Sequence, residues 1–396
     1  GYKQTELGII PEDWEIVNLG SVAKINGRIG FRGYTTADLV GVGQGAYTIG
    51  GKHITNMVLD LHDAEYISWQ KYYESPEIMV RKGDIVFAQR GTLGKSAFIV
   101  NDIGPATINP SLVLINKIKC DNEYLSYWLQ CDKIVEYICS INSQTSIPMI
   151  TQNQIEHIPV VLSRIKAEQQ AIAEALGDID GLIATLDKKI AKKRLIKQGA
   201  MSQLLTGKKR LPGFSDPWVE KKLGEIGYTY SGLTGKSKDD FGQGNAKYIT
   251  FLNVLANPIL KENLFGSITI RENEQQNKVQ FGDLFFNTSS ETPEDVGTCA
   301  VLLSYHEELY LNSFCFGYRL TDDNVLGLYL AYYFRSRLGR QLMTSLAQGA
   351  TRYNLSKELF NASRIILPET KDEQIAIATM LNDMDKEIDD LEAQRD

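Results

Sequence analysis

The chain is poor in the residues that build metal, redox or disulfide sites. It has five cysteines and four histidines in 396 residues, and no two cysteines stand in a C-x-x-C arrangement. An odd cysteine count argues against a disulfide framework, and the scattered histidines lack the spacing of zinc ligands. We therefore expect reduced cysteines and no bound metal.

Long apolar runs are also missing. No stretch approaches the roughly 18 apolar residues that a membrane-spanning helix needs. The first ten residues lack the basic start and apolar core of a signal peptide. With 43% hydrophobic and 23% charged residues, the composition is typical of a soluble globular protein. We expect a cytoplasmic protein with no membrane partner.

An excess of positive charge is lacking as well, since the net charge is -7. This argues at first against a nucleic-acid partner, because phosphate contacts need Lys and Arg. The charge is unevenly distributed, however: it is -3 over residues 1–164, +5 over 165–210, -2 over 211–368 and -7 over 369–396. Almost all of the acidic excess thus lies in the last segment, and the objection is weakened.

Segments that resemble enzyme motifs lack residues that those motifs require. Residues 91–96 read Gly-Thr-Leu-Gly-Lys-Ser and imitate the end of a phosphate loop, but Gln89 stands where the first glycine is required. Residues 109–112, Asn-Pro-Ser-Leu, lack the second proline and the aromatic residue of an adenine methyltransferase motif. No glycine motif for a methyl donor accompanies them. We expect the chain not to be catalytic.

What the chain does contain is a long internal repeat. Trp14 and Trp218 lie 204 residues apart, and Glu-Gln-x-Ala-Ile-Ala at 168–173 returns 205 residues later at 373–378. So long a period indicates duplicated domains rather than a solenoid. Each copy has short strand-like runs and then a helical stretch, which favours α+β domains with a mixed or antiparallel sheet. The strand-like runs are 84–88, 97–100, 111–115, 283–286 and 300–303, and the helical stretches are 122–138 and 324–346.

Each copy ends in a helix with an apolar residue at alternating spacings of four and three. The first seam is Ile172, Leu176, Ile179, Ile183, Leu186 and Ile190, and the second is Ile377, Leu381, Met384, Ile388 and Leu391. This spacing is typical of a coiled coil, although each helix could instead pack on its own domain. The first helix is basic over 188–194 and the second acidic over 383–392, which favours pairing between them. We predict an antiparallel pair, because the globular copy between the helices must return the chain. A helix over 165–206 would span on the order of 60 Å.

Several motifs together resemble those of a known family. They are Tyr-Lys-x-Thr-Glu-Leu-Gly-x-Ile-Pro-x-x-Trp at 2–14, Lys-Gly-Asp-Ile-Val at 82–86, Gly-Thr-x-Gly-Lys at 91–95, Glu-Gln at 168–169 and Leu-Leu-Thr-Gly-Lys at 204–208. Their order around two heptad helices resembles the specificity subunit of type I restriction-modification enzymes, over essentially the whole chain. Copy two departs from the pattern, with Asn-Thr-Ser-Ser-Glu at 287–291 where copy one has Gln-Arg-Gly-Thr at 89–92.

The resemblance implies two target-recognition domains, each reading one half of a split double-stranded DNA sequence, with an antiparallel coiled coil setting the gap. We place the first domain at 1–160, the central helix at 161–207, the second domain at 208–367 and the C-terminal helix at 368–396. It also implies two methyltransferase subunits and translocating restriction subunits as partners. S-adenosylmethionine, ATP and Mg²⁺ are then expected on those partners, and no cofactor in this chain.

Base edges are read by side chains such as Arg, Lys, Asn and Gln, while Ser, Thr and backbone N–H groups hold phosphates. We expect such residues on polar loops next to strands, although any one of them could be an ordinary solvated residue. In copy one the candidates are Lys52, His53, Gln89, Arg90, Thr92, Lys95, Gln144, Thr145 and Ser146. In copy two they are Thr250, Asn253, Asn287, Thr288, Ser289, Gln348, Thr351, Arg352 and Tyr353. The basic runs at 188–194 and 208–210 could serve charge pairing and partner docking, or contact DNA phosphates.

Two other functions stay open at this point. The paired domains and rod could form a scaffold that binds only proteins, or the chain could be a stand-alone modification enzyme. The missing methyl-donor motif disfavours the second. If both copies read DNA, the half-site centres should lie about one helical turn apart, roughly 10 bp or somewhat more.

Overall fold

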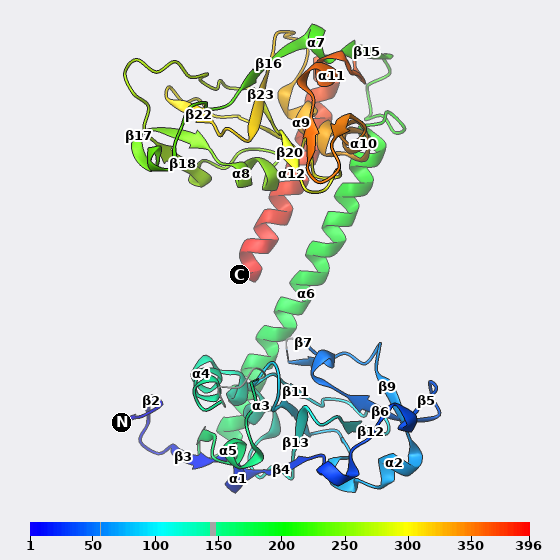
Figure 1. Ribbon diagram of the computed structural model, residues 1–396, viewed down its shortest axis with the longest axis vertical. Coiled ribbons are helices and arrows are strands. Elements are labelled where there is room, and N and C mark those ends of the chain that lie inside the picture. Colours follow the sequence, from blue (N-terminus) through cyan, green and yellow to red (C-terminus); the bar gives the residue numbers. More distant parts are fainter. Residues whose placement is uncertain (56, 143–147) are drawn as a thin grey trace. The chain divides into compact units, whose positions relative to one another are not determined.

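The computed structural model describes residues 1–55, 57–142 and 148–396, in two compact units. Unit 1 comprises residues 1–182 and unit 2 residues 183–396. Each unit contains one α+β copy of the repeat, as the sequence predicts (Figure 1). The long helix α6 (Lys166–Leu204) contributes its first part to unit 1 and its second part to unit 2.

The centre of unit 1 is a four-stranded antiparallel sheet. Its strands are β4 (Lys24–Gly27), β10 (Ile85–Ala88), β11 (Ser96–Phe98) and β13 (Leu112–Asn116), in the order β11-β10-β13-β4. Along β10, Ile85 and Phe87 belong to a core cluster shared with the helices, whereas Val86 and Ala88 belong to a second cluster shared with the neighbouring sheet. Because both faces are covered, the strand is a continuous apolar run without polar alternation.

That neighbouring sheet is mixed, in the order β12-β6-β9-β5, with β12 parallel to β6. Its strands are β5 (Leu39–Val40), β6 (Gly45–Ile49), β9 (Glu65–Ser68) and β12 (Ala106–Ile108). Two-stranded pairs complete the unit: β1 (Tyr2–Thr5) with β2 (Gly8–Pro11), β3 (Glu15–Asn18) with β14 (Pro159–Leu162), and β7 (Ile54–Thr55) with β8 (Val58–Leu59).

Unit 2 repeats the order of these two sheets, with three strands in its mixed sheet instead of four. The antiparallel sheet β21-β19-β23-β16 corresponds to β11-β10-β13-β4, and the mixed sheet β22-β17-β18 corresponds to β12-β6-β9. The bounds are β16 (Gly227–Ser231), β17 (Phe241–Ile249), β18 (Phe265–Ile268), β19 (Leu284–Asn287), β21 (Cys299–Val301), β22 (Leu309–Leu311) and β23 (Cys315–Leu320). The smaller strands are β15 (Trp218–Lys222) with β26 (Arg364–Pro368), and β20 (Ser289–Ser290) and β24 (Ala347–Gln348) on either side of β25 (Tyr353–Leu355).

Four short helices of unit 1 correspond in chain order to four helices of unit 2. The helices of unit 1 are α1 (Leu19–Val22), α2 (Trp69–Tyr73), α3 (Asn122–Gln130), α4 (Asp132–Ser140) and α5 (Gln152–Glu156). Those of unit 2 are α7 (Leu223–Ile226), α8 (Phe251–Ala256), α9 (Gly327–Arg335), α10 (Arg337–Leu346), α11 (Lys357–Ala362) and α12 (Lys371–Arg395). The helical stretches predicted over 122–138 and 324–346 are confirmed, and each consists of two helices. They break at Cys131 and Ser336, whose ψ angles of 143° and 167° are extended.

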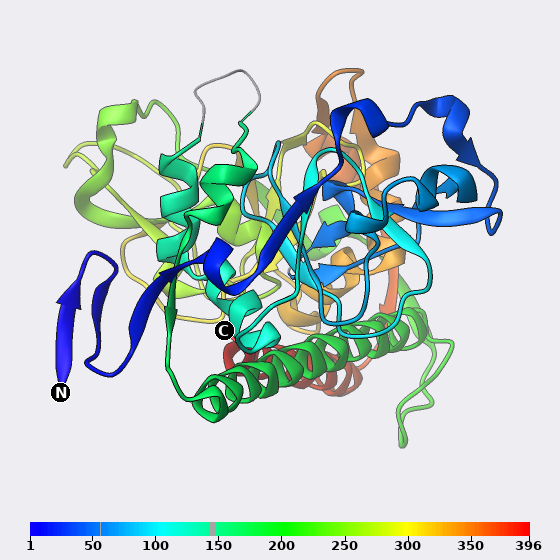
Figure 2. The ribbon, with the colours of Figure 1, turned by 90° about the horizontal axis from the view of Figure 1, so that it is seen from below.

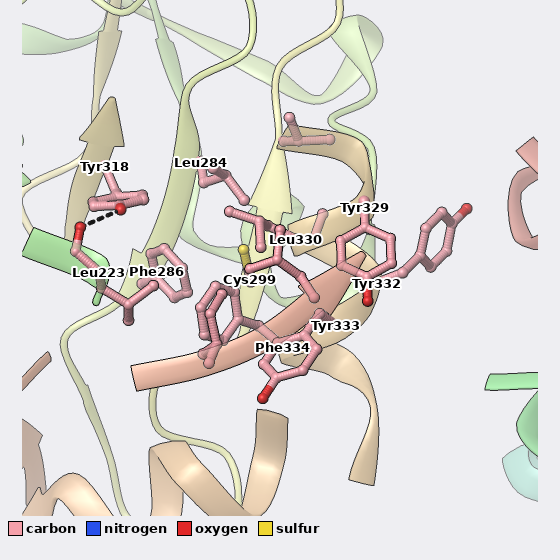
Figure 3. Close-up of a cluster of buried hydrophobic side chains, with 14 of the residues drawn as sticks. Leu223, Leu284, Phe286, Cys299, Tyr318, Tyr329, Leu330, Tyr332, Tyr333 and Phe334 are labelled. Atoms are coloured by element: carbon pink, nitrogen blue, oxygen red, sulfur yellow. Dashed lines mark hydrogen bonds between the residues drawn. The ribbon is translucent and has the colours of Figure 1, made fainter. Parts of the chain in front are cut away.

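The core of unit 2 is unusually aromatic (Figure 3). The ring of Phe286 stacks on Phe316 at 5.2 Å between centroids and meets Phe334 edge-on at 5.1 Å. The buried hydroxyl of Tyr318 donates to the carbonyl of Leu223 at 2.6 Å. A partner for that hydroxyl is what makes a buried tyrosine tolerable. These contacts fix α7 and α9 against the sheet.

The second part of α6 packs beside α12 within unit 2 (Figures 1 and 2). Ile190 and Ile388 are 3% and 7% exposed and share one apolar cluster with Leu391. Lys193 Nζ lies 2.5 Å from a carboxylate oxygen of Glu387. Since residues later in α6 meet residues earlier in α12, the helices run antiparallel, as predicted.

Candidate nucleic-acid interface

Four loop segments meet at one place in unit 1, which we call its loop corner. They are residues 50–53, 89–92, 109–111 and 148–150. The backbone of Gln89 joins three of them, donating to Ser111 O at 3.0 Å and accepting from Ile150 N at 3.0 Å. Asn109 N donates to Ile49 O at 2.8 Å and thereby fixes the first segment. Main-chain hydrogen bonds therefore assemble this corner.

Unit 2 builds a loop corner with the same bonds, from residues 250–253, 288–291, 312–314 and 353–355. Thr288 takes the place of Gln89: it donates to Phe314 O at 2.9 Å and accepts from Leu355 N at 2.8 Å. Asn312 N donates to Ile249 O at 3.2 Å. The two units thus present the same frame with different side chains.

The asparagine that recurs in both copies has a structural role at this corner. Asn109 Oδ1 accepts the backbone N–H of Ser111 at 3.0 Å, and Asn312 Oδ1 accepts that of Phe314 at 2.8 Å. Such a bond to the residue two positions later forms an Asx turn. The turn directs the chain from one sheet into the central strand of the other.

Of the first two candidates of copy one, Lys52 is exposed and His53 is buried. His53 is 3% exposed, and its Nδ1 accepts the N–H of Gly50 at 2.9 Å. Burial and the neighbouring Lys52 lower the pKa of His53, so its neutral form is favoured. Lys52 is solvent-facing and its Nζ lies 3.0 Å from Asp63 Oδ2. The hydrogen bond from Lys52 in turn lowers the pKa of Asp63.

The remaining described candidates of copy one face solvent at the corner. Arg90 is exposed, and the side chain of Gln89 is half-buried with Nε2 donating to Pro110 O at 3.1 Å. Thr92 and Lys95 are exposed on the same connection between β10 and β11. Gln144, Thr145 and Ser146 lie outside the described residues.

Two asparagines among the copy-two candidates are internal supports. Asn287 is 1% exposed, and its Oδ1 accepts Thr298 N at 2.6 Å. Asn253 is fully buried, with Nδ2 donating to Lys261 O at 2.8 Å and Oδ1 accepting Lys261 N at 3.1 Å. Thr250 caps α8 by accepting the N–H of Asn253 at 3.4 Å. These side chains shape the corner from inside.

A cavity of about 610 Å³ opens at the loop corner of unit 2. It is lined by Phe251, Leu255, Asn287, Ser289, Ser290, Glu291, Thr292, Asp295, Thr298 and Arg352. Arg352 Nε donates to Ser289 Oγ at 3.2 Å, which brings two candidates together. Gln348 and Thr351 are exposed nearby in the chain, and Tyr353 is half-buried in β25.

The two corners differ in charge. The corner of unit 1 carries Lys52, Arg90 and Lys95 as exposed or solvent-facing cations. In unit 2 the cavity combines Arg352 with the carboxylate of Glu291. A cation suits guanine or phosphate, whereas a carboxylate accepts from cytosine. The frames are alike, but their hydrogen-bonding surfaces are not.

The predicted seam residues have different environments along the helices. In α6, Ile172 is half-buried, Leu176 and Ile179 are 38% and 54% exposed, Ile183 and Leu186 are half-buried, and Ile190 is buried. In α12, Ile377, Leu381, Ile388 and Leu391 are buried and Met384 is half-buried. Of the basic runs, Lys193 and Arg194 form ion pairs with α12, and Arg210 forms one with Glu373.

Sequence reasoning missed how the repeated Glu-Gln pair works. Gln169 Oε1 accepts Asp121 N at 2.8 Å, and Gln374 Oε1 accepts Leu326 N at 2.9 Å. Gln169 thus ties the first turn of α6 to the start of α3, and Gln374 ties the first turn of α12 to the start of α9. The exact return of this Glu-Gln pair at the start of both long helices was the signal that could have revealed this.

In the part of the chain that the structure describes, no cluster of three His, Cys, Asp or Glu side chains could hold a metal ion. Nor is any helix there long and apolar enough to cross a bilayer. The cysteines in this structure are free thiols.

Comparison with known proteins decides what kind of chain this is. A family model described as the type I restriction modification DNA specificity domain matches twice, over residues 11–193 and 215–396. The chain belongs to this family. It is a specificity subunit of a type I restriction-modification system.

Relatives of this specificity subunit include two proteins of Methanocaldococcus jannaschii. The type I restriction enzyme MjaX specificity subunit is 27% identical over 298 residues, which cover 66% of this chain and 65% of that protein. The MjaVIII specificity subunit is 30% identical over 223 residues, covering 53% and 49%. The matches thus span about half to about two thirds of these relatives' lengths.

Solved structures share the fold of the specificity subunit. The S subunit of a type I restriction-modification system from M. genitalium has a TM-score of 0.58 at 14% identity, covering 97% of this chain and 92% of that one. A chain from a structure that describes complex assembly and conformational transition of the type I R-M system has a TM-score of 0.59 at 17% identity, covering 97% and 93%.

Proposed function

We propose that each unit reads one half of a bipartite double-stranded DNA site and that the paired helices set the gap between the halves. The observation that carries this proposal is the loop corner. The same four segments are joined by the same backbone bonds in both units, while the side chains around them differ. A common frame with different side chains is what two readers of different half-sites require.

The recognition domains in this proposal are residues 1–160 and 208–367, and the spacer consists of residues 161–207 and 368–396. The candidate readers remain those named from the sequence, and the exposed ones are the most direct. Arg90 can offer its guanidinium to O6 and N7 of guanine, and Gln89 can pair with adenine. In unit 2, Arg352 and Glu291 offer both a donor and an acceptor at one cavity.

Partners supply the chemistry that this chain lacks. We propose that the chain docks two methyltransferase subunits and joins restriction subunits, which would hold S-adenosylmethionine, ATP and Mg²⁺. The net charge of -7 implies weak intrinsic affinity for DNA, so tight binding should need these partners. Because the proposed substrate is double-stranded DNA, we place the complex in the cytoplasm.

The test is methylome sequencing of cells that express this chain together with its methyltransferase. A bipartite methylated motif that appears only with this chain is the expected result. Arg90→Ala should then relax or abolish one half of the motif, and Arg352→Ala the other half, since each mismatched contact costs about 1–3 kcal/mol. If both proteins are folded and no new motif appears, the proposal is wrong and a protein-only scaffold is favoured.

The spacer is tested by its length. One heptad inserted into both helices adds roughly 10 Å, which corresponds to about 3 bp of B-DNA. We expect the unread gap to lengthen by about that amount while both half-sites are retained. An unchanged gap in a folded, methylating complex would refute the role of the helices as a ruler.

A further inference from the structure

Two arginines in unit 2 form a support that unit 1 lacks. Arg335 ends α9, and Arg340 lies one turn into α10. Within the described residues, neither guanidinium forms an ion pair with a carboxylate. Both side chains are nonetheless half-buried, and this burial lowers the pKa of both guanidinium groups, that of Arg335 to about 10. Each must therefore be satisfied by other acceptors.

Arg335 satisfies its donors on backbone carbonyls at the end of α8. Its Nη2 donates to Val254 O at 2.7 Å, Leu255 O at 3.0 Å and Asn257 O at 2.9 Å. Its Nε donates to Cys299 O at 2.5 Å in β21. A cation at a helix C-terminus is favourable because the free carbonyls there carry partial negative charge. Arg335 thus clamps α8 to the central sheet.

Arg340 holds the loop on the other side. Its Nη1 donates to Gly297 O at 2.9 Å and its Nη2 to Glu294 O at 2.7 Å. Val296 O accepts from the same Nη2. A planar fork with five N–H donors suits such a set of carbonyls, whereas a lysine offers a single ammonium.

These two anchored segments are the walls of the cavity at the loop corner. Phe251 and Leu255 come from α8, and Glu291, Thr292, Asp295 and Thr298 come from the loop that Arg340 holds. The connection between β19 and β21 is also longer than the corresponding connection between β10 and β11. It runs over residues 288–298 in unit 2, against 89–95 in unit 1. A longer polar loop has more conformational freedom to lose, so it needs more anchoring.

Unit 1 has neither arginine. The residue that ends α3 is Gln130, which reaches only Gly94 O, at 3.3 Å, and the hydroxyl of Ser96. With the helix spacing of 205 residues, Val135 stands where unit 2 has Arg340. The same fold therefore forms without the arginine clamp, and the clamp serves the extended loop of unit 2.

We propose that Arg335 and Arg340 are positioning residues that set base discrimination at the unit 2 half-site by fixing the two walls of this cavity. This inference rests on the proposed function. Neither arginine need touch DNA. Their bonds hold α8 and the loop that carries Glu291, two of the segments that line the cavity together with Arg352. A displacement of that backbone changes which base edges fit.

The experiment uses the full chain with its methyltransferase and reads methylation at cognate sites and at sites with one mismatched base. The variants Arg335→Gln and Arg340→Val install the residues of unit 1, and Arg340→Lys keeps the charge. Arg337→Gln is the matched control, because Arg337 is exposed at the start of the same helix. Thermal melting of each purified complex establishes that it is folded.

A single mismatch normally lowers binding by roughly 5- to 150-fold. We expect Arg335→Gln and Arg340→Val to reduce this discrimination about tenfold at the unit 2 half-site alone, with Arg340→Lys intermediate and Arg337→Gln unchanged. The unit 2 half-site is the one altered by Arg352→Ala. Should Arg335→Gln fail to fold, Arg340→Val and Arg340→Lys decide the question, because Arg340 contacts only the loop.

Three outcomes would each overturn the inference. They are an equal loss of discrimination at both half-sites, weaker cognate methylation with discrimination intact, and no change in a folded Arg340→Val complex. If the unmodified chain directs no bipartite motif, the proposed function itself fails. That outcome is separate from a failure of the clamp, because it is seen before any variant is compared.

Discussion

Replacing Gln374 by glutamate should produce a pH-dependent loss of stability. Gln374 is fully buried. Its Oε1 accepts Leu326 N at 2.9 Å, and its Nε2 donates to Asn324 O and Pro368 O, both at 3.0 Å. A carboxylate would still accept the Leu326 N–H, but it would face two carbonyl oxygens with no hydrogen to offer them.

The magnitude follows from those two lost bonds. The lost bond to the buried Pro368 O costs about 1–3 kcal/mol, and the lost bond to the part-buried Asn324 O costs about 1–2 kcal/mol, so the loss at neutral pH is about 2–5 kcal/mol. Protonation restores one donor, and the pKa of the new glutamate in the folded state should therefore lie above its unfolded value of about 4.3. The destabilisation is then smallest below that unfolded pKa and grows as pH rises through the folded pKa.

Thermal melting of the Gln374→Glu variant against the unmodified chain, at about pH 5 and about pH 8, measures this difference. For a unit of this size we expect Tm to fall by about 4–20 °C at the higher pH and by clearly less at the lower pH. Gln341→Glu is the control, because Gln341 is exposed on α10 and the change there should cost less than about 0.5 kcal/mol. An equal loss at both pH values, or one no larger than that of the control, would refute the reasoning.

Two further predictions concern the helix pair and the unit 1 corner. Ile388→Ala removes a buried seam side chain and should cost about 2–4 kcal/mol, which speeds amide exchange in the last part of α12 by about 30-fold or more. Ile375→Ala, at a 42% exposed position of the same helix, should change exchange little, and similar effects in both variants would contradict the seam. Burial lowers the pKa of His53, so acidification from about pH 7 through its unfolded pKa of about 6.5 should destabilise unit 1. His53→Asn installs the residue that copy two has as Asn253, and it should remove this part of the acid sensitivity in melting curves. If the pH profile of the variant is unchanged, His53 is not the source of the acid sensitivity.

The repeat and the helix seam could be predicted because they depend on spacing alone. The apolar pattern repeats every seven residues, and the opposite charges of α6 and α12 indicate that these helices pair with each other. The break at Ser336 was missed because Arg335, Arg337 and Leu338 around it favour a continuous helix. Only the tertiary packing reveals that its hydroxyl caps a new helix, accepting Gly339 N at 3.4 Å.

The side chains at the loop corners were harder to predict than the loops. The sequence places Asn287 and Asn253 on polar segments beside strands, which is where readers of DNA are expected. In the structure their amides are used by backbone groups of neighbouring loops. Whether an asparagine faces solvent or supports a loop depends on how the chain after it folds back, as Lys261 does onto Asn253. The roles of Arg335 and Arg340 could not be predicted because their acceptors lie much farther away in the sequence, such as Val254 for Arg335.

The backbone construction of the unit 1 corner has an evolutionary consequence. Gln89 and Ser111 are joined through main-chain atoms that every residue but proline possesses. A substitution at exposed Arg90 or Thr92 therefore leaves the frame intact and should change stability by less than about 0.5 kcal/mol. Such positions can drift through many side chains while the domain still folds. A restriction system with this corner could acquire new target sequences by point mutation at almost no thermodynamic cost.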